Sequence, residues 1–124
     1  MSSASPLDSG QITINLAALR DNYLTMKSKS GAAETACVVK ADAYGLGLSQ
    51  VAPVLYAAGC RSFFVAQTQE ALALRALLPD VVIYVLNGLP TGAAAAFAAA
   101  DLRPCLISLA QITAWQAHCI SEKT

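Results

Sequence analysis

Some segments of this chain place apolar residues at every second position, and others place them at helical spacing. These segments follow one another in turn, which predicts strands followed by helices. Residues 11–15 alternate apolar with polar positions, as a short strand does, and Asn15 can cap a following helix. Apolar residues then recur at helical spacing over residues 16–26, and Gly31 lies in the break after this helix. The chain therefore opens with one predicted strand–helix unit.

The same alternation continues to the end of the chain. Residues 35–39 form an apolar run that predicts a strand buried on both faces. Thr68 is a candidate N-cap for a helix, and Ser108 with Gln111 matches a capping box for the last one. The further strands are predicted at 62–65, 81–86 and 102–107, and the further helices at 48–58, 68–78, 92–100 and from 109 toward 120.

Five successive strand–helix units imply an α/β fold with a parallel sheet. A doubly wound sheet of five strands would be complete in about 120 residues. A (β/α)8 barrel needs about 250 residues, so this chain would be only its N-terminal part. Periodicity alone leaves both architectures open. Residues 1–10 are small and polar, and we predict a loose tail there, ahead of one domain at 11–124.

Composition narrows the class of protein. Hydrophobic residues make up 56% of the chain and charged residues 13%, which is typical of elements buried on both sides. Eight basic and eight acidic residues cancel, so nothing indicates a nucleic-acid partner. No apolar stretch approaches the roughly 18 residues that span a bilayer, and the first residues do not resemble a secretory signal. Without Cys-x-x-Cys pairs, the four cysteines predict no zinc site. We expect a cytoplasmic protein with free thiols.

The most specific chemistry lies in residues 38–47, which read VVKADAYGLG. In either architecture ligands bind at the carboxyl ends of parallel strands, where Lys40 is predicted to lie. A lysine at the end of a buried strand is poorly solvated, and burial lowers a lysine pKa toward the range in which the neutral amine forms imines. Lys40 could therefore hold the aldehyde of pyridoxal phosphate, and Tyr44 could donate to a phosphate oxygen. Taken alone, these residues also fit a surface lysine and a packed tyrosine ring, and Asp42 fits a hydrogen-bonding loop residue.

The decapeptide resembles the pyridoxal phosphate signature of alanine racemases, A-V-x-K-A-[DN]-A-Y-G-H-G, with Leu46 in place of the common histidine. Flanking segments are also similar to the family. These are residues 13–22 (TINLAALRDN), residues 63–66 (FFVA), residues 70–75 (EALALR) and residues 85–88 (VLNG). The resemblance covers about residues 12–120.

This resemblance implies a fold, a reaction and three site residues. The fold would be the N-terminal part, about five βα units, of a (β/α)8 barrel. The reaction would be the pyridoxal phosphate-dependent interconversion of L-alanine and D-alanine by two-base Cα proton transfer, supplying D-alanine for peptidoglycan. Lys40 would be the Schiff-base lysine and one catalytic base, Tyr44 would bind the phosphate, and Leu86 would lie near the cofactor ring. The full-length protein would be a homodimer.

Length is the main departure from the family, whose enzymes are far longer. The second base and most of the groups that bind the phosphate and the substrate carboxylate would follow Thr124, so we expect this chain to be truncated and inactive alone. A non-catalytic pyridoxal phosphate-binding barrel is the alternative, although its loops do not resemble A-D-A-Y-G. A complete doubly wound binding domain is a third reading. It lacks support because no acidic pair follows the first strand and no Gly-x-Gly-x-x-Gly loop is present.

Overall fold

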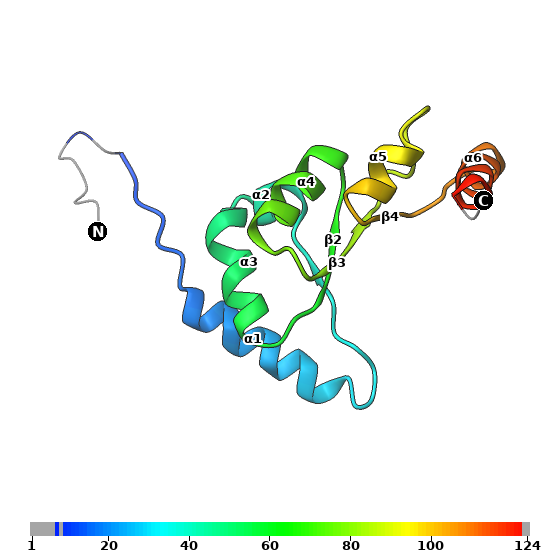
Figure 1. Cartoon of the computed structure of the whole chain (residues 1–124). Helices are drawn as coiled ribbons and strands as arrows, with labels where there is room; N and C mark the ends of the chain where they lie inside the picture. Colours follow the sequence, from blue (N-terminus) through cyan, green and yellow to red (C-terminus); the bar gives the residue numbers. More distant parts are fainter. Residues whose placement is uncertain (1–6, 8, 123–124) are drawn as a thin grey trace.

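A four-stranded parallel sheet forms the centre of the computed structural model, which describes residues 7 and 9–122 (Figure 1). The strands are β1 (Cys37–Val38), β2 (Ser62–Val65), β3 (Val82–Val85) and β4 (Leu102–Pro104), and they are adjacent in this order. The helices are α1 (Leu16–Lys29), α2 (Lys40–Tyr44), α3 (Leu48–Ala57), α4 (Thr68–Leu77), α5 (Ala94–Ala99) and α6 (Leu109–Ser121). No helix in this described part is both long and apolar enough to cross a membrane.

One face of the sheet is buried under helices. Across the strands, Cys37 pairs with Phe63, Phe63 with Ile83, and Ile83 with Leu102, and the last three side chains are almost fully buried. Helix α4 packs on β2 and β3, and α5 packs on β4. The hydrophobic core therefore lies between this face and the helices, and it includes Leu74 of α4 and Phe97 of α5.

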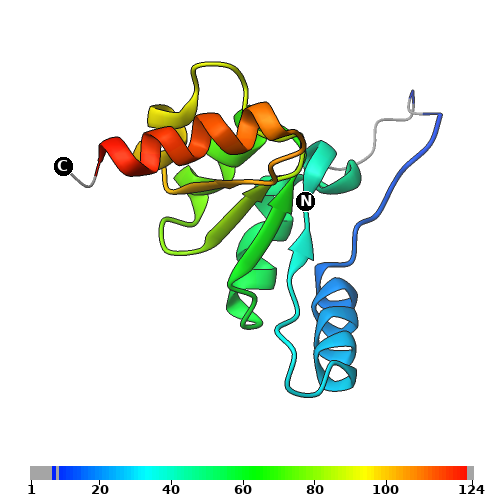
Figure 2. The ribbon, with the colours of Figure 1, turned by 90° about the vertical axis from the view of Figure 1, so that its right-hand side faces the viewer.

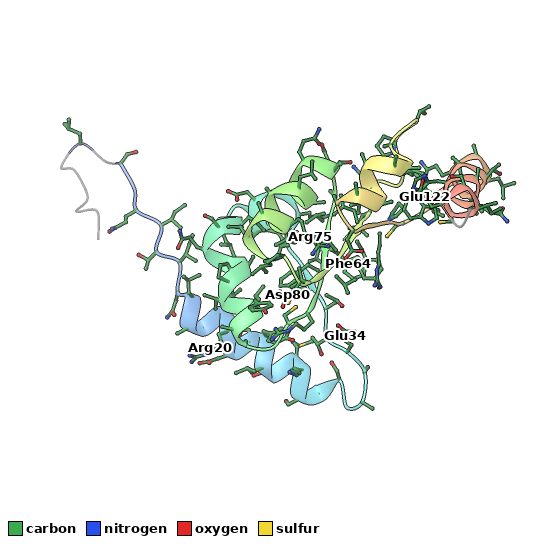
Figure 3. All side chains as sticks on the ribbon, in the orientation of Figure 1. Arg20, Glu34, Phe64, Arg75, Asp80 and Glu122 are labelled. Atoms are coloured by element: carbon green, nitrogen blue, oxygen red, sulfur yellow. The ribbon has the colours of Figure 1, made fainter. Side chains whose placement is uncertain are left out.

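The opposite face of the sheet is open, and Figure 2 looks toward it. Its central row is Val38, Phe64, Tyr84 and Arg103, one residue from each strand. The rings of Phe64 and Tyr84 stack with centroids 4.5 Å apart, and Arg103 donates from its guanidinium to the Tyr84 hydroxyl at 3.3 Å. In Figure 3, Phe64 lies on the side of the sheet away from α3 and α4. Val38 is 45% exposed, so the prediction that residues 35–39 are buried on both faces is wrong.

The α/β class is confirmed, and the strand order favours the barrel over the doubly wound sheet. A doubly wound sheet carries helices on both faces and reverses its strand order at a switch point. Here the strands follow chain order, and α3 and α4 cover the same side (Figure 1). This arrangement is that of consecutive βα units in part of a (β/α)8 barrel.

The predicted first strand is wrong, so four strands replace five. Residues 11–15 are extended but pair with no strand in the described part of the chain, and in Figure 1 they lead away from α1. Ile12 is 90% exposed, so its apolar alternation has no surface to cover there. The cap is confirmed, because the Asn15 side chain accepts from the Ala18 amide at 3.0 Å. Most of the predicted tail, residues 1–6 and 8, lies outside the described residues.

Two other helix starts differ in detail from the predictions. The N-cap of α4 is Gln67 rather than Thr68, and Gln67 forms a capping box with Glu70. The N-cap of α6 is Ser108 as predicted, with its hydroxyl accepting from the Gln111 amide at 3.2 Å. The Gln111 side chain does not complete that box, because its Oε1 accepts from the amides of Leu89 and Ile107 instead. Gln111 therefore ties α6 to the loop that follows β3.

Candidate functional site

Lys40 lies at the carboxyl end of β1, as the sequence predicts. Continuing the strand register by two residues places Lys40, Ala66 and Leu86 in one row at this edge of the sheet. Backbone hydrogen bonds support that register beyond the strands, because the Leu86 amide donates to the Val65 carbonyl at 2.8 Å. Side chains alternate along strands, so Ala66 and Leu86 share the open face with Phe64 and Tyr84. Lys40 follows Val39, whose ψ of 25° is no longer extended, and it begins α2 at this edge.

The chain turns with left-handed geometry directly after Lys40. Residues 41–44, which include no glycine, have φ angles between 51° and 55°. Each such residue costs roughly 1–2 kcal/mol relative to right-handed backbone. The turn is closed by hydrogen bonds from the Ala43 amide to the Val39 carbonyl at 3.0 Å and from the Gly45 amide to the Ala41 carbonyl at 2.9 Å. Gly45 continues it at φ 81°, which a glycine adopts without strain.

Asp42 connects this turn to α3. Its Oδ1 accepts from the amide of Leu48, the first residue of α3, at 2.7 Å, and its carbonyl accepts from the Gly47 amide at 2.9 Å. The carboxylate therefore satisfies one of the free amides at the start of a helix. This confirms the interpretation of Asp42 as a hydrogen-bonding loop residue.

Glu70, in the first turn of α4, holds the Lys40 turn from the other side. Its Oε1 accepts from the Ala41 amide at 2.6 Å, and its Oε2 accepts from the Ala66 and Gln67 amides at 2.8 and 2.9 Å. Burial alone would raise the pKa of Glu70. The three amide hydrogen bonds and the charge of Lys40 outweigh burial and hold this pKa below the usual glutamate range.

Glu70 is a site residue that the sequence did not reveal. The spacing Gln67-x-x-Glu70 matches a capping box. That spacing could have indicated the hydrogen bond from the Gln67 amide to Glu70. The bond to Ala41 joins positions 29 residues apart, and no local pattern indicates it.

Tyr44 lies close to Lys40, and Leu86 lies further along the same edge. The Lys40 Nζ is 5.9 Å from the centroid of the Tyr44 ring, and Tyr44 is 63% exposed. Tyr44 also lines a cavity of about 360 Å³ at the outer edge of β1, together with residues of α1 and α3. Leu86 is half-buried at the end of β3, so β2 lies between it and Lys40.

These residues fit an aldehyde cofactor that carries a phosphate group. Lys40 is half-buried at the strand end, and the exposed ring of Tyr44 lies near its amine. The apolar Leu86 lies at the same edge, where a flat ring could contact it. An amine nucleophile, a hydroxyl donor and an apolar neighbour are the kinds of group that hold pyridoxal phosphate in enzymes.

Comparison with known proteins gives the family. Residues 14–124 match the sequence profile of the alanine racemase N-terminal domain, and the chain belongs to this family. It is 55% identical over 111 residues to a catabolic alanine racemase of Agrobacterium fabrum, covering 89% of this chain and 29% of that protein. It is 49% identical over 119 residues to an alanine racemase of a Methylobacterium species, covering 96% of this chain and 32% of that protein.

Solved structures agree with the sequence relatives. The chain superposes on alanine racemase from Bartonella henselae, which carries covalently bound pyridoxal phosphate, with a TM-score of 0.86 and 45% identity. That match covers 90% of this chain and 31% of the Bartonella chain. The biosynthetic alanine racemase from Pseudomonas aeruginosa matches with a TM-score of 0.72 and 31% identity, over 82% of this chain and 28% of that one. The chain thus spans about three tenths of the length of the relatives it matches.

Proposed function

We propose that this chain supplies the cofactor-binding lysine of a pyridoxal phosphate-dependent alanine racemase. The observation that carries the proposal is the position of Lys40. Its amine projects from the carboxyl end of a parallel strand, and its turn reads K-A-D-A-Y-G with Tyr44 beside it. Membership of the alanine racemase family and the covalent cofactor of the Bartonella relative support it.

Each site residue has a separate task in this proposal. Pyridoxal phosphate, when bound, supplies an electron sink for negative charge at the substrate Cα. Lys40 would hold the cofactor covalently through Nζ and, once released by the substrate, would transfer the Cα proton on one face. Tyr44 would donate its hydroxyl to a phosphate oxygen, and Leu86 would provide an apolar contact for the ring.

The remaining parts of the proposal concern the whole protein. Racemisation needs a proton donor on each face of the planar carbanion, and Lys40 serves one face. We therefore propose that residues 1–124 alone do not racemise alanine and that a homodimeric, cytoplasmic full-length enzyme supplies the second base. Its D-alanine product would feed peptidoglycan synthesis.

Borohydride trapping tests the cofactor site directly. The chain is incubated with pyridoxal phosphate, reduced with borohydride and digested, and the lysine adducts are measured by mass spectrometry. We expect the phosphopyridoxyl adduct predominantly on Lys40 rather than on Lys27 or Lys29, which lie at the solvated end of α1. Tyr44→Phe should weaken the labelling of Lys40 and leave Lys27 and Lys29 unchanged. Equal labelling of all lysines would refute the site.

A second experiment separates the racemase from a non-catalytic pyridoxal phosphate-binding protein. In a longer protein that contains this chain, a racemase exchanges the Cα proton of alanine with deuterium from solvent. A binding protein forms the Lys40 adduct without that exchange. Absence of exchange in a protein that labels on Lys40 would therefore favour the binding function.

A further inference from the structure

We propose that Glu70 is a positioning residue that fixes Lys40 at the cofactor edge by holding the left-handed turn closed. This inference rests on the function proposed above for Lys40. Glu70 would not touch cofactor or substrate, and it would act through the backbone of residue 41. The proposal gives a purpose to a carboxylate whose contacts exceed those of a helix cap.

The carboxylate divides its two oxygens between two segments. Oε1 binds the Ala41 amide in the Lys40 turn, and Oε2 binds the amides of Ala66 and Gln67 after β2. A glutamine has one acceptor oxygen and one NH₂ group at these positions. It would therefore have to direct N–H toward N–H on one side. Only an ionised carboxylate satisfies both sides together, and its hydrogen bonds are stronger than those of a neutral acceptor.

The turn that Glu70 holds is strained, so it needs such support. Residues 41–44 lie in the left-handed region without a glycine among them, and this conformation persists only where surrounding contacts enforce it. The Ala41 amide is the first donor of the turn, directly after Lys40. Without an acceptor at that position, the backbone is freer to return to right-handed or extended geometry. The direction of the Lys40 side chain would change with it.

Few other charges act on Glu70, so its state can be followed separately. Lys40 of α2 is the charged group that acts on it, and this attraction favours the ionised form. Helix α3 carries no charged residue, and its Tyr56 donates to Asp80. Strand β3 presents Tyr84, which accepts from Arg103 on the open face. Asp42 is a second carboxylate in the same turn, where it accepts from the Leu48 amide, so comparison with Glu70→Gln assigns a titration of the Ala41 amide to Glu70.

The experiment compares Glu70→Gln and Glu70→Ala with a matched control, Glu34→Gln. The Glu34→Gln substitution also removes one negative charge. Glu34 accepts a hydrogen bond from the Ser62 hydroxyl, at the end of β2 opposite to Glu70. After pyridoxal phosphate and borohydride, the ratio of adduct on Lys40 to adduct on Lys29 should fall about tenfold or more in both Glu70 variants. In Glu34→Gln the ratio should stay within about twofold of the parent chain.

An NMR titration of the parent chain provides a readout that needs no variant. The Ala41 amide proton should shift with an acid midpoint below the usual glutamate range, because its acceptor is the Glu70 carboxylate. In Glu70→Gln that titration should vanish. A readout of this kind depends on the charge of Glu70 and not on general packing.

The two measurements separate failure of this proposal from failure of the proposed function. The parent chain could label all lysines equally while the Ala41 amide titrates as expected. That result would refute the cofactor site at Lys40 and support only the hydrogen bond between Glu70 and Ala41. If Lys40 labels selectively but the Glu70 variants keep the parent ratio, the positioning role is wrong. An Ala41 amide that is indifferent to pH would also overturn it.

Discussion

Arg75 of α4 offers the sharpest test of how the connecting segments are held together. Its guanidinium donates to backbone carbonyls in the segments that follow α4 and α5 (Arg75 is labelled in Figure 3), and the side chain is only 16% exposed. The acceptors, with their distances, are Val81 (2.7 Å), Asp101 (2.7 Å), Pro79 (3.1 Å), Ala100 (3.1 Å) and Leu78 (3.5 Å). One side chain thus ties the loop before β3 to the loop before β4.

Arg75→Met keeps the apolar stem and removes every one of these donors. The Val81 carbonyl belongs to a residue that is 2% exposed, so leaving it without a partner should cost about 1–3 kcal/mol. The other carbonyls lie nearer to solvent and regain water, so together they add roughly 1 kcal/mol. The contact with the Asp101 carboxylate, at 3.6 Å and with that group 84% exposed, adds little. We expect the free energy of unfolding to fall by about 2–4 kcal/mol.

Urea denaturation followed by circular dichroism measures this change. With a slope of about 1–2 kcal/mol per molar urea, the midpoint should fall by about 1–4 M. Arg75→Lys keeps the positive charge but lacks the planar guanidinium with its several donors. It should lower the unfolding free energy by roughly half as much as Arg75→Met. The matched control is Arg20→Met, because Arg20 is 50% exposed and, among the described residues, its guanidinium binds the neighbouring Asp21. An Arg75→Met midpoint no lower than that of Arg20→Met would refute the reasoning.

Three further predictions concern backbone strain, pH and thiol access. Gly45 has φ 81° and open space around the position of a new methyl group, so Gly45→Ala should lower the unfolding free energy measured in urea by about 1 kcal/mol. The control Gly10→Ala, also in open space but without positive φ, should leave this free energy almost unchanged. The pKa of Glu70 is lowered by folding, so its stabilisation is present above the unfolded glutamate pKa of about 4.3 and is lost as pH falls through the folded value. Unfolding free energy measured across that window should therefore decline more steeply in the parent chain than in Glu70→Gln. Among the free thiols, exposed Cys119 should react with a thiol reagent in the folded chain, and Cys60, with 0% exposure, only after unfolding; equal rates would contradict the packing of Cys60.

Local patterns were sufficient to predict most of the helices and the later strands. Residues 82–85 and 62–65 are strands because β-branched and aromatic side chains alternate between the helix-covered face and the open face. The same alternation at residues 11–15 does not produce a strand, because a strand also needs a neighbouring strand to pair with. The periodicity of a segment does not show whether such a neighbour exists.

The site was predictable as far as its residues are consecutive. Lys40 and Tyr44 belong to one short motif, and the parallel sheet places that motif at a strand end. The left-handed turn was not predictable, because alanine, aspartate and tyrosine have no local preference for positive φ strong enough to indicate it. Glu70 was missed for a related reason. Its decisive contact, with Ala41, is formed between two segments that approach only in the folded sheet.

The left-handed turn also bears on the order in which this domain folds. Four strained residues store roughly 4–8 kcal/mol, which no contact within the turn offsets on its own. The compensating acceptor lies 29 residues later, on a helix that must first pack against β2 and β3. Nucleation is therefore expected in the β2–α4–β3 region, with the Lys40 turn closing after the rate-limiting step. Substitutions in this turn should change the unfolding rate while leaving the folding rate nearly unaltered.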